Sequence, residues 1–163
     1  MPDPAIPTDI RLRPVELDDE TFLLAVFAST REPERHAIAW EAEAWETFVR
    51  TQHAAQRTHY ETHFPDAAHS VILCGRKRVG RLWVYRSEAE IRLLDIAVLP
   101  EHRGRGIGTR VIRTLQEEAR QADLPLHHAV ELANASARRL YERLGFASIE
   151  TRGIHTLMEW TPS

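Results

Sequence analysis

The glycine-rich run HRGRGIGT at residues 102–109 constrains the fold of this chain more than any other feature. It follows a β-like segment that ends at Pro100, and a helix-like segment begins near Ile107. Glycines at every second position let the backbone turn sharply and let its amide groups approach a ligand closely. Because amides at a helix N-terminus are unpaired donors with a partial positive charge, the run predicts a pocket for a phosphate group.

The spacing of the glycines argues against two common classes of phosphate-binding loop. A Walker loop needs Gly-Lys followed by Ser or Thr, and residues 102–109 contain no lysine. A dinucleotide-binding loop needs G-x-G-x-x-G after the first strand of a βαβ unit, whereas Gly104, Gly106 and Gly108 follow a G-x-G-x-G pattern late in the chain. The remaining structural alternative is a turn in which Arg103 and Arg105 are simply solvated.

A second string, NASARRLYERLGF, begins at Asn134. Asn134 closes a strand-like stretch at residues 126–132, and residues 136–144 form a short helical pattern that ends at Gly145. Gly145 is also an ordinary helix stop, so a purely structural interpretation of the string exists.

Together, R-x-x-G-x-G from Arg103 and the string from Asn134 resemble two motifs of the GNAT N-acetyltransferase superfamily, over about residues 9–160 and most strongly over 90–146. The resemblance implies that the loop amides hold the pyrophosphate of acetyl-CoA, the cosubstrate. It implies that Asn134 contacts the pantetheine arm, which lies beside the strand segment 95–98, and that Tyr141 lies near the thioester sulfur. The implied cofactor-binding residues are Ile96, Ala97, Val98, Arg103, Gly104, Arg105, Gly106, Ile107, Gly108, Thr109, Asn134 and Tyr141.

Acetyl transfer to an amine needs a neutral amine, a stabilised oxyanion and a protonated leaving thiolate. The base, or the residue that holds a water acting as base, is Asp95 or Glu131, because each is an acid within an apolar strand pattern. A backbone N–H at Ala97 or Val98 would polarise the thioester carbonyl, a contribution of about 3 kcal/mol. Tyr141 is the expected general acid. Structural alternatives remain: both carboxylates could pair with arginine, and Tyr141 could pack against the sheet.

Composition excludes several other classes. A chain of 163 residues with 43% apolar content predicts one domain with a full core, and a formal charge of −3 gives no general attraction to nucleic acid or anionic membrane. We find no apolar run of membrane-spanning length and no signal-peptide pattern at the N-terminus. The single cysteine, Cys74, lies in an apolar strand pattern, which favours a cytoplasmic protein without disulfides.

Hydrophobic periodicity predicts an α/β (α+β) fold, a single domain at residues 9–160 after a flexible leader at 1–8. The expected sheet is mixed, mostly antiparallel and six- to seven-stranded, with helices on both faces. The strands are expected at 10–13, 69–76, 80–86, 90–99, 126–132, 146–150 and 154–160, and the helices at 18–29, 41–63, 107–119 and 136–144.

The resemblance implies that the segment 31–64, between the first two expected strands, shapes acceptor choice. His59, Tyr60 and His63 are therefore candidate pocket residues, whereas the aromatic residues Trp40, Trp45 and Phe48 suit a core or a pocket wall equally well. No zinc-binding pattern such as HExxH is present, so we expect no metal.

These observations predict an N-acetyltransferase that transfers an acetyl group from acetyl-CoA directly to a primary amine, in a ternary complex. The acceptor would be a small molecule or a peptide. The alternative is a non-catalytic acyl-CoA-binding sensor or partner module with the same fold. A homodimer is a further possibility, for which the sequence offers no decisive feature.

Overall fold

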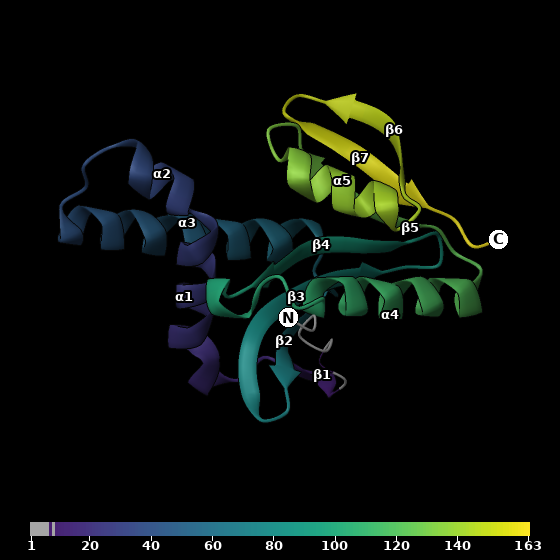
Figure 1. Ribbon diagram of the computed structural model, residues 1–163, viewed down its shortest axis with the longest axis horizontal. Helices are drawn as coiled ribbons and strands as arrows, with labels where there is room; N and C mark the ends of the chain where they lie inside the picture. Colours follow the sequence, from purple (N-terminus) through teal and green to yellow (C-terminus); the bar gives the residue numbers. More distant parts are fainter. Residues whose placement is uncertain (1–6, 8) are drawn as a thin grey trace, which may run out of the picture. The chain divides into compact units, whose positions relative to one another are not determined.

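The computed structural model describes residue 7 and residues 9–163 (Figure 1). The leader predicted at residues 1–8 lies outside the described residues apart from Pro7. The strands hydrogen-bond in the order β1-β2-β3-β4-β5-β7-β6 in one seven-stranded sheet, which confirms the predicted mixed α/β architecture. They are β1 (Ile10–Pro14), β2 (Ala68–Cys74), β3 (Lys77–Arg86), β4 (Ile91–Val98), β5 (Leu126–Glu131), β6 (Ala147–Arg152) and β7 (His155–Trp160).

The chain comprises two compact units, which are described separately. The first contains the residues up to 83 together with 95–107, and the second contains 84–94 together with 108–163. The division passes through β3 and β4, so each of these strands contributes to both units.

In the first unit, a helix packs on the apolar surface of β2 and β4. Helix α1 (Glu20–Thr30) follows a short 3-10 turn, η1 (Leu17–Asp19), and buries Leu23 and Val26 against Val71 of β2 and Ala97 of β4. Strand β1 pairs antiparallel with β2, with Leu12 opposite Ile72. This packing fixes the position of the end of β4, which matters for the site.

Helix α3 (Ala42–His63) confirms the long amphipathic helix predicted at 41–63. Trp40, Trp45 and Phe48 contact one another with ring centroids 5.1–5.6 Å apart and pack with Phe27 and Val49. These aromatic residues therefore belong to the core of the first unit. The sequence patterns missed α2 (Glu32–Ala37), since six residues that include a proline near the start carry no readable periodicity.

A buried carboxylate fixes the turn between β1 and α1. Asp19 is 1% exposed and accepts hydrogen bonds from Arg13 at 2.7 and 2.9 Å, from Arg78 at 3.1 Å and from the backbone of Glu16 at 2.8 Å. The bonds from Arg13 are the main reason that the pKa of Asp19 lies well below its ordinary value. Arg78 lies in β3 and pairs with Asp19, and the turn between β2 and β3 is at residues 75–76.

The second unit contains β5, β6 and β7, parts of β3 and β4, and two helices. Strand β4 pairs parallel with β5, with Leu93 beside His128, and β5 and β6 both pair antiparallel with β7. Helix α4 (Ile107–Ala122) confirms the helix predicted at 107–119 and buries a stripe of residues at four-residue steps, namely Ile107, Val111, Leu115 and Ala119. Gln116 donates to the Leu144 carbonyl at 2.8 Å, which joins α4 to the end of α5 (Ala135–Arg143).

Two further observations concern Cys74 and the lengths of the helices. Cys74 ends β2, in agreement with its predicted place in a strand, and is half-buried. None of the helices in the described part of the chain is long and apolar enough to cross a membrane.

Candidate active site

The predicted phosphate loop leads directly into α4. After a short 3-10 turn, η2 (Pro100–His102), Gly104 and Gly106 have φ of +75° and +80°, a backbone conformation that side chains with a Cβ rarely adopt. A Cβ on Gly104 would meet nothing within 4 Å, so the glycine is required by conformation rather than by crowding. The loop therefore leaves its backbone open just before a 16-residue helix.

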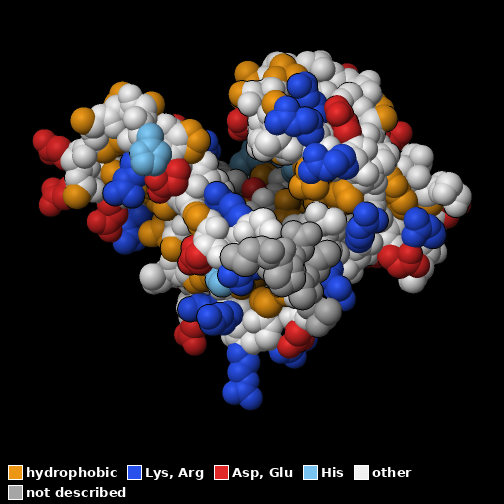
Figure 2. Space-filling model, viewed as in Figure 1, with side chains coloured by type: hydrophobic (Ala, Val, Ile, Leu, Met, Phe, Trp, Pro, Cys, Tyr) orange, Lys and Arg blue, Asp and Glu red, His pale blue; other side chains and the backbone are white. Residues whose placement is uncertain are grey.

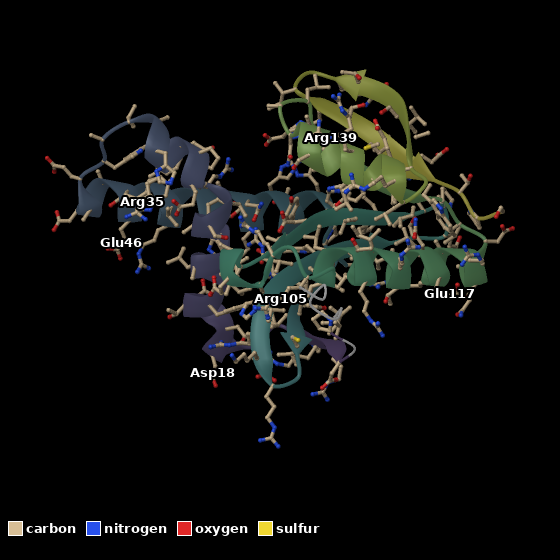
Figure 3. The ribbon with its side chains drawn as sticks, viewed as in Figure 1. Asp18, Arg35, Glu46, Arg105, Glu117 and Arg139 are labelled. Carbon is tan, nitrogen blue, oxygen red and sulfur yellow. The ribbon has the colours of Figure 1, made fainter. Side chains whose placement is uncertain are left out.

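The two arginines of the loop have different surroundings. Arg103 donates from Nε to the Val98 carbonyl at 2.8 Å and from Nη2 to Ser29 Oγ at 3.3 Å, so it ties the loop to the end of β4 and to α1. Arg105 is exposed and forms no ion pair with the other described residues (Figure 3). The expectation of simple solvation therefore fits Arg105 and not Arg103.

The end of β4 presents alternate backbone groups to its two edges. The amide of Leu99 donates to Val79 of β3 at 2.8 Å, and the Ala97 carbonyl lies against Gly80 of β3. Because backbone groups alternate along a strand, the amides of Ile96 and Val98 point to the edge away from β3. Of the two expected oxyanion donors, Val98 and not Ala97 has its N–H available on that edge.

Asp95 is held by a buried arginine. Arg81 of β3 is 1% exposed at its side chain and donates from Nε to Asp95 Oδ2 at 2.8 Å, and from Nη2 to Gln56 Oε1 at 2.6 Å. The Asp95 side chain itself is 20% exposed. Asp95 thus has the arginine partner that the structural alternative expected. This ion pair explains how an otherwise apolar strand accommodates a carboxylate.

Glu131, the other candidate base, has a contrasting environment in the second unit. It ends β5 opposite His155 of β7, is exposed, and forms no ion pair with another described residue. Its backbone carbonyl accepts from the Asn134 amide at 2.9 Å. Its carboxylate is therefore free to interact with solvent or with a ligand.

Two further predicted residues of the second unit, Asn134 and Tyr141, lie at the start of α5 and within it. Asn134 caps this helix, since its Oδ1 accepts from the Ala137 amide at 3.1 Å, while the residue stays exposed. Tyr141 is 3% exposed and packs between Phe146 and His128, with ring centroids 5.2 and 4.9 Å away. Arginines gather on the surface over α5, among them Arg139 (Figures 2 and 3).

Sequence reasoning missed a cluster of buried polar side chains from α3, β2 and β3. His53, His69 and Arg81 each bury a nitrogen that has no partner among the described residues, namely His53 Nε2, His69 Nε2 and Arg81 Nη1. His69 stacks on Trp83 at 3.8 Å. Arg81 could have been found from the sequence, because a charged residue within the apolar run 79–84 is the same signal that identified Asp95.

The two buried histidines, His53 and His69, predict that the folded protein loses stability as the pH falls. Burial, with the positive charge of Arg81, lowers the pKa of His53 to about 4 and that of His69 to about 3. Between these values and the ordinary pKa of about 6.5, the unfolded chain binds more protons than the folded protein, so stability falls as pH falls below about 6.5. Each histidine contributes a slope of at most about 1.4 kcal/mol per pH unit.

Urea unfolding measured from pH 7 to pH 4 tests this expectation. His69→Phe keeps a ring against Trp83 and removes one titrating group, so the decline should become shallower. The range stays above the region where Asp19 loses its contribution, because a carboxylate of lowered pKa loses stability only below about pH 4. Identical slopes in both proteins would contradict the assignment.

The expected acceptor residues of α3 separate into two groups. Tyr60 is half-buried and packs edge-on against Trp83, with ring centroids 4.9 Å apart, so it belongs to the same buried cluster as His69. His59 and His63 are exposed with ring centroids 4.3 Å apart, and His63 Nδ1 donates to the His59 carbonyl at 2.9 Å. Within the described ranges, no group of three His, Cys, Asp or Glu side chains is arranged to hold a metal ion.

Residues 25–146 match the family model of the acetyltransferase (GNAT) family. No curated protein sequence matches the chain significantly. Among solved structures, the fold is similar to that of the PaiA N-acetyltransferase from Thermoplasma acidophilum in complex with coenzyme A. The TM-score is 0.70 at 16% sequence identity, over 93% of this chain and 98% of that one.

Two further structures show the same fold. An acetyltransferase from Thermus thermophilus has a TM-score of 0.67 at 19% identity, over 95% of this chain and 98% of that chain. A mutant of the spermidine N-acetyltransferase from Vibrio cholerae has a TM-score of 0.63 at 17% identity, over 94% of each chain.

Proposed function

Since the chain belongs to the acetyltransferase (GNAT) family, we propose that it is an N-acetyltransferase that moves an acetyl group from acetyl-CoA directly to a primary amine. The acceptor is the amine of a small molecule or a peptide, bound together with acetyl-CoA in a ternary complex. The observation that carries the proposal is the loop from Arg103 to Gly108, whose positive-φ glycines precede the N-terminus of α4.

The loop suits a pyrophosphate group. Gly104 and Gly106 leave the backbone without Cβ atoms, and amides at the start of a long helix attract anions. Arg105 is exposed beside them and adds positive charge (Figure 3). The cofactor-binding set of the proposal remains the loop residues 103–109, the strand segment 96–98, Asn134 and Tyr141. A fold neighbour was solved with coenzyme A, which supports this choice of ligand.

Val98 supplies the proposed oxyanion donor. Acetyl-CoA brings the acetyl group as a thioester, whose carbonyl oxygen gains negative charge during attack by the amine. The Val98 amide points away from β3, and such a donor contributes about 3 kcal/mol to catalysis. Arg103 binds the carbonyl of the same residue at 2.8 Å and so fixes the peptide backbone there.

The proposed proton transfers are assigned to carboxylate and phenol side chains. Asp95 or Glu131 accepts the proton of the amine, directly or through water, and Tyr141 returns a proton to the leaving sulfur. Support for Tyr141 comes from its burial and from the rings that fix it on both sides. The exposed carboxylate of Glu131 and the anchored carboxylate of Asp95 offer two different routes for the proton.

Release of free thiol from acetyl-CoA, measured with a panel of primary amines, tests this function. Tyr141→Phe should lower kcat by about 100-fold or more, because it removes the proton donor, while the KM for acetyl-CoA changes less than about twofold. Tyr85→Phe, at a half-buried tyrosine of β3, is the matched control and should retain the wild-type rate. Equal kcat in Tyr141→Phe would assign protonation to water. Binding of acetyl-CoA without turnover of any amine would favour the sensor.

A further inference from the structure

Arg81 occupies a position where an apolar residue would serve stability better. It is fully buried in the middle of β3, and its neighbours Leu82 and Trp83 are buried as well. Removing a guanidinium from water costs several kcal/mol, and replacing a buried ion pair with apolar side chains is often neutral or stabilising. Stability therefore gives no sufficient reason for a charge at this position.

Three structural elements hold the Arg81 guanidinium in one orientation. Nε donates to Asp95 on β4 at 2.8 Å, Nη2 donates to Gln56 on α3 at 2.6 Å, and the group lies 5.7 Å from the centre of the Phe27 ring on α1. A long side chain fixed from three sides can fix its partner in turn. The orientation of the Asp95 carboxylate is thus set from the core of the first unit.

The pairing uses only one oxygen of Asp95. Arginine commonly binds a carboxylate through two parallel hydrogen bonds, which occupy both oxygens. Here Nη2 is bound to Gln56, and Oδ2 alone receives a hydrogen bond from Arg81. Oδ1 accepts no hydrogen bond from the described residues, and the side chain is 20% exposed. The arrangement therefore fixes the carboxylate through Oδ2 and leaves Oδ1 as an acceptor atom on a partly exposed side chain.

We propose that Arg81 is a positioning residue, which orients Asp95 so that Oδ1 accepts a hydrogen bond from the acceptor amine. The proposal rests on the proposed function, because Asp95 directly precedes the segment 96–98 assigned to the thioester. An amine bound at Oδ1 is held next to the residues that polarise the carbonyl it attacks. Gln56 acts indirectly, because it accepts a hydrogen bond from Arg81 and so holds the guanidinium that orients Asp95.

Steady-state kinetics of a double-mutant cycle tests the positioning role. The probe is whichever of benzylamine, spermidine or a lysine-containing peptide the wild type acetylates fastest. Arg81→Met should raise the KM for this amine at least tenfold and leave the Kd for acetyl-CoA within twofold. Arg81→Met combined with Asp95→Asn should be no worse than Asp95→Asn alone, because no carboxylate remains to be oriented.

Further variants separate positioning from general damage. Arg81→Lys should raise the KM for the amine less than Arg81→Met does. Gln56→Met keeps the charges of Arg81 and Asp95 and should raise this KM by an intermediate factor, which keeps the test valid even if Arg81→Met folds poorly. Arg13→Met disrupts the buried pair with Asp19 in the same unit, and it should lower stability without changing the KM for the amine. Absence of wild-type turnover would speak against the proposed function. Wild-type turnover with an unchanged KM in Arg81→Met and Gln56→Met, or additive losses in the cycle, would overturn the positioning role alone.

Discussion

Replacing Gly80 with alanine should cost the protein about 3 kcal/mol of folding free energy or more. A Cβ at this position would lie 2.2 Å from the Ala97 carbonyl oxygen and 3.1 Å from the Val98 Cα, both of which are backbone atoms. Because β3 and β4 cannot absorb the overlap by rotating a side chain, the strands must move apart locally. Urea unfolding measures the loss, and the melting temperature should fall by about 10 °C.

Gly108→Ala is the matched control for this substitution. The added Cβ would meet nothing within 4 Å in the first turn of α4, where alanine is a better helix former than glycine. Its stability should stay unchanged or rise by up to about 1 kcal/mol. Equal stability of the Gly80→Ala and Gly108→Ala variants would mean that β3 and β4 are not in the close contact described.

Gly106→Val should lower the affinity for acetyl-CoA by about tenfold to 100-fold while the fold survives. Residue 106 has a φ of +80°, and a residue with a Cβ in this conformation costs about 1–3 kcal/mol. Valine would therefore favour another loop conformation, and the binding-competent one would become rarer by the corresponding factor. Calorimetric titration of the variant with acetyl-CoA measures the loss.

Gly153→Val controls for backbone strain alone. Gly153 lies in the turn between β6 and β7 with a φ of +58°, and a Cβ there would meet nothing within 4 Å. The substitution should lower the free energy of unfolding by about 1–3 kcal/mol, the cost of a Cβ in this conformation, and leave the affinity for acetyl-CoA unchanged. If both valine variants bound acetyl-CoA like the wild type, the loop would have no part in binding the cosubstrate.

Local patterns predicted the regular elements well. The pattern of three- and four-residue steps in α3 and the four-residue stripe of α4 each extend over several helical turns, and the structure confirms both helices. Helix α2 was missed because it is short and contains Pro33. The loop was predicted from the spacing of its glycines, and the positive φ angles of Gly104 and Gly106 show the conformational reason for that spacing.

Long-range pairings were harder to predict. The sequence marked Asp95 as an acid that needs a partner, but nothing in it selects Arg81 among the arginines of the chain. The close approach of Gly80 to Ala97 likewise depends on how two strands pack. An isolated glycine in a strand pattern signals such a contact only in general terms. These features arise from tertiary structure, which single-sequence patterns do not encode.

Calorimetric titration of the folded protein with acetyl-CoA and with free coenzyme A tests the central claim most directly. We expect both ligands to bind with micromolar dissociation constants, since they share the pyrophosphate that the loop from Arg103 to Gly108 is proposed to hold. Absence of binding up to millimolar ligand, in protein shown by circular dichroism to be folded, would contradict the claim and leave the glycine run as a structural turn.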